Sequence, residues 1–171
     1  MPMSRLLQFA ASINRLNTFV GKSVSWLTGG LVLLICIDVL MRYVFQFSQI
    51  WIIELERYFF AFIFLFGAAY TFQADKHVRV DLFYSRLSEK GKAWVNLIGG
   101  VFLLFPWAWI VLEVSLRYAR KSWAIGEGSP QPGGLPALYI LKFAIFFGFL
   151  LLILQCIANI IQSLHIIRQQ D

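Results

Sequence analysis

The sequence predicts an all-α integral membrane protein with four transmembrane helices and an amphipathic interfacial helix at the amino terminus. Hydrophobic residues make up 59% of the 171 residues and charged residues only 14%, whereas soluble domains carry about 25% charged residues. The mean hydropathy is +0.70. The apolar residues also form blocks long enough to face lipid, which predicts a single membrane domain, residues 1–171, and not a soluble enzyme.

Charged residues bound the apolar blocks. The uncharged runs cover residues 23–37, 58–74, 93–112 and 143–164. A membrane-spanning helix needs about 20 apolar residues, so the two shorter runs must be extended. The first reaches residue 45 because Asp38 and Arg42, at i and i+4, can pair on one helix face. The second begins near Trp51. The predicted transmembrane helices therefore cover residues 23–45, 51–74, 93–119 and 137–164, with a kink at Pro106 in the third.

Residues 3–20 have the pattern of an amphipathic helix. Polar residues at Asn14, Arg15 and Asn17 interrupt the apolar core that a signal peptide requires. Apolar residues recur instead every three or four positions, at Leu6, Phe9, Ile13, Leu16 and Val20. This spacing predicts an amphipathic helix that lies in the plane of the lipid headgroups.

The distribution of lysine and arginine predicts the orientation in the membrane. With the amino terminus inside, cytoplasmic segments contain nine of the fifteen basic residues: Arg5, Arg15, Lys22, Lys76, Arg79, Arg86, Lys90, Lys92 and Arg168. We therefore expect both termini and the 75–92 segment to be cytoplasmic. The net charge of +6 suits contact with anionic membrane lipids. Nucleic acid is not an expected partner, because binding it would require a soluble basic face.

The sequence offers little support for catalysis or for a cofactor. The two histidines, His77 and His165, are too few and too close to the membrane edge for a metal cluster. A haem-anchoring subunit stays open as an alternative, since bis-imidazole ligation needs only two histidines. Both cysteines, Cys36 and Cys156, fall inside predicted membrane helices and imply no disulfide framework. We expect no catalytic residue, no metal and no cofactor.

Two groups of polar residues in the predicted helices are candidates for an interface with a subunit or with lipid. Glu54 and Arg57 lie three residues apart at the start of the second helix and can pair. A stripe in the fourth helix contains Gly148, Gln155, Asn159 and Gln162, and amide side chains rarely face lipid. Packing within a four-helix bundle and contact with another polypeptide both account for this stripe.

Basic residues at the end of the third helix are a candidate docking surface. Arg117, Arg120 and Lys121 fall on the outer side, against the positive-inside trend. They could contact an acidic patch on a binding protein or anionic lipid headgroups, and ordinary snorkelling at a helix end also accounts for them. The following segment, residues 125–136, is rich in Gly and Pro and predicts a turn.

Four segments occur in an order and spacing that resemble a known family. They are Glu54-Leu55-Glu56-Arg57-Tyr58 with Phe66-Gly67-Ala68-Ala69, His77-Val78-Arg79-Val80-Asp81, Gly126-Glu127-Gly128-Ser129 to Leu135-Pro136, and Gly148 to Gln155. Together they resemble the small, DctQ-like membrane subunit of tripartite ATP-independent periplasmic (TRAP) transporters over most of residues 20–165. The family typically has an acidic pair at the start of the second helix, whereas this chain has Leu55 between Glu54 and Glu56.

The resemblance implies a transport role in the bacterial inner membrane. In this family a large membrane subunit carries the substrate and sodium sites, and a periplasmic substrate-binding protein delivers an organic acid such as a carboxylate. This chain would then be a membrane scaffold for the large subunit, in a sodium symport system. The alternatives are a haem- or quinone-anchoring subunit of a respiratory complex, a stand-alone small transporter and a non-transport scaffold.

Overall fold

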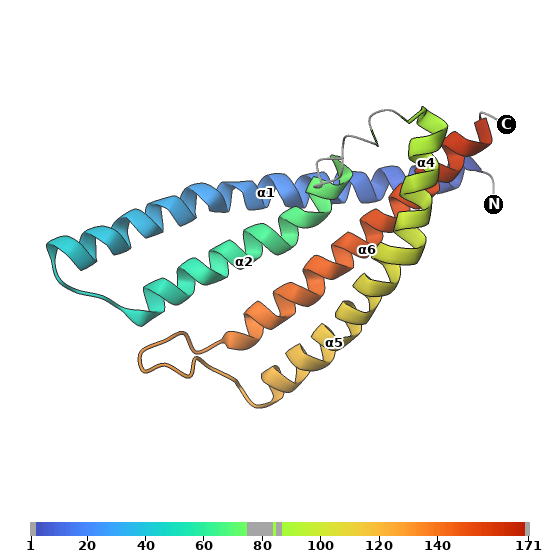
Figure 1. Cartoon of the computed structure of the whole chain (residues 1–171). Helices are drawn as coiled ribbons and strands as arrows, with labels where there is room; N and C mark the ends of the chain where they lie inside the picture. Colours follow the sequence, from blue (N-terminus) through green and yellow to red (C-terminus); the bar gives the residue numbers. More distant parts are fainter. Residues whose placement is uncertain (1–2, 75–83, 85–86, 170–171) are drawn as a thin grey trace.

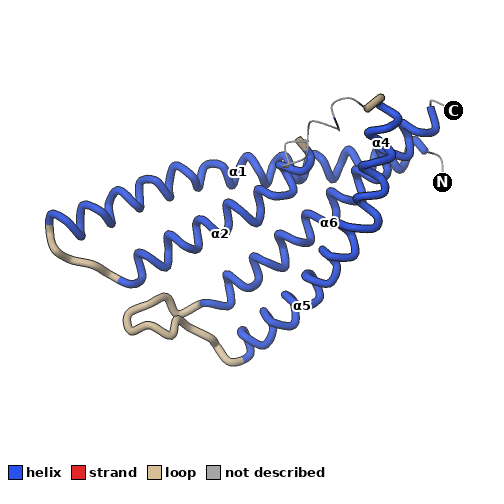
Figure 2. The backbone as a smooth tube through the Cα atoms, viewed as in Figure 1, coloured by secondary structure: helices blue, strands red, loops and turns tan. Residues whose placement is uncertain are grey.

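The structure, a computed structural model, describes residues 3–74, 84 and 87–169 of the chain. Its helices are α1 (Met3–Val44), α2 (Ile50–Gln73), α4 (Glu89–Ile98), the π-helical segment η1 (Gly99–Leu104), α5 (Phe105–Ala124) and α6 (Leu138–Gln169). Within these described ranges every regular element is a helix (Figure 2). The all-α prediction is therefore confirmed. The His77 to Asp81 motif lies outside the described residues.

The helices form an elongated bundle organised around α6. α1 and α2 make an antiparallel hairpin on one side of α6, and α5 packs along the other side with α4 and η1 continuing its path (Figure 1). The chain ends meet at one end of the bundle, which we call the terminal end (Figure 1). The 45–49 and 125–137 loops lie at the opposite end, which we call the loop end (Figure 1).

Three helical segments are long and apolar enough to cross a membrane: Met3–Val44, Glu89–Ala124 and Leu138–Gln169. They contain the predicted span 93–119 and, except for one terminal residue each, the predicted spans 23–45 and 137–164. The fourth predicted span, 51–74, corresponds to α2, which is not among these three segments. Three of the four predicted spans are thus supported by length and composition.

The amino-terminal residues do not form a helix of their own, and their location in the headgroup plane stays a prediction. They continue without a break into α1, which is 42 residues long. The buried residues of this part include Ala10 and Ile13, which pack against Ala158 of α6. Phe9, which the predicted apolar stripe includes, is 50% exposed. Tertiary packing against α6, which the helical periodicity does not reveal, determines the buried face.

A π-helical turn lies immediately before Pro106 in the third predicted span. Proline has no N–H to donate and its ring clashes with the carbonyl four residues earlier. In η1 the hydrogen bonds run to the fifth preceding residue, so the N–H of Phe105 donates to the carbonyl of Gly100. The wider turn accommodates the proline, and Pro106 then occupies the first turn of α5. The irregularity predicted at Pro106 thus takes the form of a π-helix.

Small residues let the helices approach closely, as is common in membrane bundles. Ala69, Ala108, Ala119 and Ala158 are each fully buried. At Gly148 of α6, an added Cβ would lie 2.9 Å from the Cβ of Leu65 and 3.0 Å from its carbonyl oxygen. The backbones of α2 and α6 therefore meet at this glycine.

Candidate functional site

Glu54 fastens the 125–137 loop to the start of α2. The side chain is buried, and its Oε1 accepts a hydrogen bond from the hydroxyl of Ser129. Its Oε2 accepts a second hydrogen bond, 2.6 Å long, from the backbone N–H of Leu135. Gly134 lies against the carboxylate, since an added Cβ there would be 2.8 Å from Oε2. One carboxylate thus holds both sides of the Gly- and Pro-rich loop, a group that we call the Glu54 clamp.

A buried lysine holds the same loop from the other side. The ammonium of Lys142 in α6 lies 2.5 Å from Oε2 of Glu127 and 3.8 Å from the centre of the Tyr118 ring. Lys142 is 6% exposed, and a buried cation requires such partners. The hydrogen bond from Lys142 lowers the pKa of Glu127 below its usual value. The ion pair therefore stays charged at neutral pH and ties the loop to α6.

Arg57 lies at the edge of the Glu54 clamp and is exposed. It lines a small cavity of about 130 Å³ together with Tyr58 and Gln131. The hydroxyl of Tyr58 donates a 3.3 Å hydrogen bond to the carbonyl of Ala137. The predicted pairing of Glu54 with Arg57 contributes electrostatically, but both oxygens of Glu54 are bound by loop donors. Of the two candidate interface residues, only Arg57 presents its side chain outward.

The basic residues of α5 form an exposed face beside this loop. Arg117, Arg120 and Lys121 are all exposed in the last two turns of the helix. Arg117 lies 3.5 Å from Glu113, and both side chains are more than 60% exposed. Such an exposed ion pair contributes little stability. The three cations, which we call the basic face, are therefore available for contact with a partner.

An amide cluster joins α1 and α6 in the half of the bundle nearer the termini. Gln155 is fully buried. Its Oε1 accepts a 2.7 Å hydrogen bond from Asn17, and its Nε2 donates to Asn14 at 2.9 Å and to Asn159 at 3.2 Å. These contacts lie inside the chain. Gln155 is thus a residue through which α6 binds α1.

The other members of the predicted α6 stripe differ in their surroundings. Gly148 is buried against Leu65 of α2. Asn159 and Gln162 are half-buried, and Asn159 takes part in the amide cluster. The stripe therefore does not act as one surface: its loop-end part contacts α2, its centre contacts α1, and Gln162 lies at the margin.

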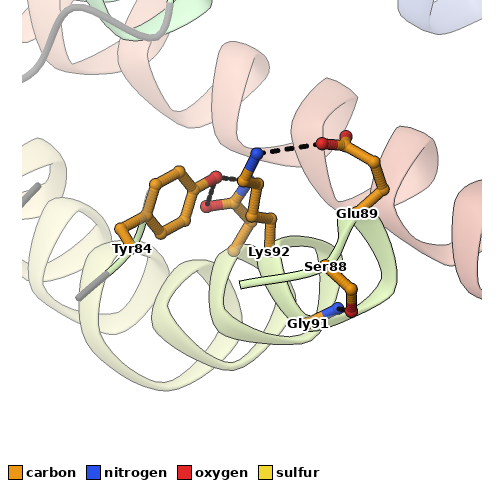
Figure 3. A network of polar contacts seen from close by, with 6 residues as sticks. Tyr84, Ser88, Glu89, Gly91 and Lys92 are labelled. Carbon is orange, nitrogen blue, oxygen red and sulfur yellow. Dashed lines mark hydrogen bonds and ion pairs between the residues drawn. The ribbon is translucent and has the colours of Figure 1, made fainter. Parts of the chain in front are cut away.

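Polar contacts at the terminal end fix the start of α4. The hydroxyl of Ser88 accepts a 3.2 Å hydrogen bond from the N–H of Gly91, which is the N-cap arrangement that satisfies a free helix donor. Lys92 pairs with Glu89 at 2.9 Å, and the hydroxyl of Tyr84 lies beside α4 in the same group (Figure 3). These contacts explain why the helix begins at residue 89, four residues before the predicted start of the span.

The described residues contain no group of three or more His, Cys, Asp or Glu side chains able to hold a metal ion. His165 is half-buried near the end of α6, and His77 lies outside the described residues. Cys156 is buried and contacts the carbonyl of Gly100 through its sulfur at 3.5 Å, whereas Cys36 is exposed on α1.

Several important contacts were not predicted from the sequence. In the sequence Lys142 is only a basic residue near the start of the fourth predicted helix, and its pairing with Glu127 depends on how the loop folds back. Asn14 and Asn17 were used only to argue against a signal peptide. Their spacing of three residues, on one helix face, is a signal that could have indicated a polar contact with another helix.

Comparisons with known proteins point to one family. The family model that matches is described as tripartite ATP-independent periplasmic transporters, DctQ component, and it covers residues 31–165. The matched region includes the Glu54 clamp, the basic face and the whole loop between α5 and α6. The comparison with curated proteins and the comparison with solved structures each gave no match.

Proposed function

The chain belongs to the DctQ family of TRAP transporter small membrane components, and from this we propose that it is the scaffold of a sodium-driven uptake system. In this proposal it supports a large permease subunit, and a periplasmic substrate-binding protein delivers an organic acid, such as a carboxylate, to the complex. The family assignment carries the proposal. The bundle supports it physically, because its internal contacts stiffen it at both ends.

The positions of the buried charges support a scaffold over a stand-alone transporter. Among the described residues, the buried charged side chains are Asp38, Glu54 and Lys142, and each lies near the loop end of its helix. A self-sufficient transporter typically has a substrate site near the membrane midplane, formed by broken helices. The π-helical segment η1 itself consists of two glycines and four apolar residues.

The exposed surface supports a position in the membrane with other protein or lipid around it. Large apolar side chains on α5 and η1 are more than half exposed, among them Phe102, Leu103, Trp107 and Ile110. Lipid tails or an apolar partner helix would cover these residues. We propose that the large subunit covers part of this surface and membrane lipids cover the rest.

We propose that α2 is the fourth span and that both termini are cytoplasmic, in the bacterial inner membrane. α2 has 24 residues, about 36 Å of helix, which exceeds the roughly 30 Å hydrocarbon core. It also packs along α1. An even number of crossings agrees with the position of both chain ends at the terminal end (Figure 1). A periplasm-active reporter should be active when inserted in the 125–137 loop and inactive at Asp171; the reverse pattern would contradict this orientation.

We further propose that the basic face docks an acidic patch on the binding protein or anionic headgroups. Arg117, Arg120 and Lys121 lie on one side of α5 beside a loop that is held rigidly at both edges. Charge steering by such a surface weakens with salt. Reversal of all three charges should lower uptake and reduce its salt dependence, whereas reversal of exposed Arg168 at the terminal end should not. If uptake and its salt dependence are unchanged, the docking proposal fails.

Reconstitution in liposomes tests the scaffold proposal. We expect uptake when the chain, the large subunit and the binding protein are present with an inward sodium gradient. We expect none when this chain is omitted or when it is reconstituted alone. Uptake by the chain alone would contradict the proposal and favour a stand-alone transporter. A haem absorption spectrum in the purified chain would instead favour the respiratory alternative.

A further inference from the structure

A second charged group lies between α1 and α2, separate from the Glu54 clamp. Asp38 and Arg42 form an ion pair one helical turn apart near the loop end of α1. Glu56 of α2 lies within electrostatic range of both residues. The group thus contains two carboxylates and one guanidinium, and it carries a net charge of −1 when all three are ionised.

Two oxygen atoms of this group have no hydrogen-bond donor. Asp38 is 4% exposed, and Arg42 binds its Oδ2. The Oδ1 of Asp38 and the Oε1 of Glu56 are both buried, and neither has a hydrogen-bond partner among the described residues. Burial of an ionised carboxylate oxygen without a donor is costly. The two oxygens therefore lack either a cation to pair with or a hydrogen-bond donor.

The neighbouring cations do not pair with these two oxygens. The side chain of Arg42 is 48% exposed, so most of the guanidinium faces outward. Arg57, the next residue after Glu56, acts on Glu54 instead. Lys142 of α6 is engaged by Glu127 and by the Tyr118 ring. The basic groups that α1, α2 and α6 bring near this end are thus exposed or interact with other residues.

The inaccessibility of the two oxygens decides which ligand fits. Both atoms are buried, so a lysine or arginine from a partner, or a hydrated metal ion, would have to displace neighbouring side chains to reach them. A proton needs no such space. A protonated carboxyl group also becomes a donor and leaves the neighbouring carboxylate as acceptor.

We propose that Asp38 and Glu56 form a proton-binding site. The proton, supplied by a hydronium ion of the solvent, forms an O–H bond on Glu56, and this O–H donates to Oδ1 of Asp38, whose Oδ2 accepts from Arg42. The site then has a net charge of zero, which suits charged residues that enter a membrane in pairs. This inference concerns the folded chain itself and does not depend on the transport role.

Infrared spectroscopy of the full chain in lipid nanodiscs at neutral pH tests the site. We expect the C=O stretching band of a protonated carboxyl group, shifted in D₂O. The band should disappear in Glu56→Gln, whose amide keeps the size of the side chain and supplies an N–H donor. It should be unchanged in the control Glu113→Gln, which alters an exposed carboxylate. A wild-type spectrum without the band, or a band that persists in Glu56→Gln, would overturn the proposal.

A second variant tests the hydrogen bond to Asp38 and does not require Glu56→Gln to fold. In Asp38→Asn the acceptor loses its charge, so the band of the Glu56 carboxyl should shift in frequency or disappear. An unchanged band in Asp38→Asn would overturn the shared proton. Circular dichroism and gel filtration of each variant establish that the helical content and the particle size are retained before the spectra are compared.

Discussion

Replacement of Gln155 by Leu should destabilise the packing of α1 on α6 by about 1 kcal/mol. The variant loses two hydrogen bonds to α1, with Asn14 and Asn17, and one within α6, with Asn159. Hydrogen bonds between membrane helices contribute on average about 0.6 kcal/mol each, so the two between α1 and α6 give roughly 1.2 kcal/mol. The amide of Asn17, 1% exposed, would also lose its acceptor. Because about 1.4 kcal/mol corresponds to a factor of ten, the folding equilibrium constant should fall about 7-fold.

Denaturant unfolding of the purified chain in mixed micelles measures this effect. The helical signal follows the transition, and the free energies of the two chains are compared at equal micelle composition. Gln162→Leu is the matched control, because it makes the same exchange on α6 at a half-buried residue with no hydrogen bond to another described residue. Its free energy of unfolding should change by less than about 0.5 kcal/mol.

Two results would refute the reasoning about Gln155. If Gln155→Leu is as stable as the unaltered chain, the amide cluster does not hold α1 on α6. If Gln155→Leu and Gln162→Leu lose the same free energy, the loss reflects a general property of leucine on this helix. A loss that appears only when the large subunit is present would place the contact between subunits and not within the chain.

Two further predictions concern α6 and the loop beside it. Gly148→Ala should destabilise the chain by about 1–3 kcal/mol, because overpacking forces neighbouring atoms to move and the added methyl group would meet the backbone of Leu65. The control Gly67→Ala adds a methyl group in open space and should not destabilise the chain. Equal thermal stability of the two variants would contradict the close approach of α2 and α6 at Gly148. Lys142 lowers the pKa of Glu127, so the stabilisation by this ion pair should be complete above the ordinary glutamate pKa of about 4.3. The stabilisation should be lost as the pH falls through the lowered pKa. Hydrogen exchange of the 125–137 loop measures this loss, and equal exchange across that pH range would contradict the ion pair.

The helices could be predicted because lipid imposes a simple requirement on the sequence. A chain in hydrocarbon must satisfy its backbone hydrogen bonds within each segment, so long uncharged runs predict helices. The predicted 51–74 and 137–164 correspond to α2 (Ile50–Gln73) and α6 (Leu138–Gln169). The loop at 125–136 was predicted from its Gly and Pro content for an equally local reason.

The partners of each helix could not be predicted, because they depend on tertiary contacts. Glu54 was predicted to pair with Arg57 from their spacing, but the folded loop brings Ser129 and the Leu135 N–H to its carboxylate. Ser129 is 75 residues away in the chain. Local spacing favours near neighbours, and only the return of the loop makes the distant donors better placed.

The depth of the amide cluster in the membrane follows from the position of Gln155 along α6. Gln155 follows the start of α6 at Leu138 by 17 residues, about 26 Å along the helix. If the loop end lies at one boundary of the membrane, as we propose, Gln155 lies near the far boundary of a hydrocarbon core roughly 30 Å thick. Amides are less costly there than at the midplane. The amino-terminal turns of α1 that pack beyond this point would then lie past the hydrocarbon, where their polar residues Arg5 and Arg15 meet water while Ile13 stays buried on α6.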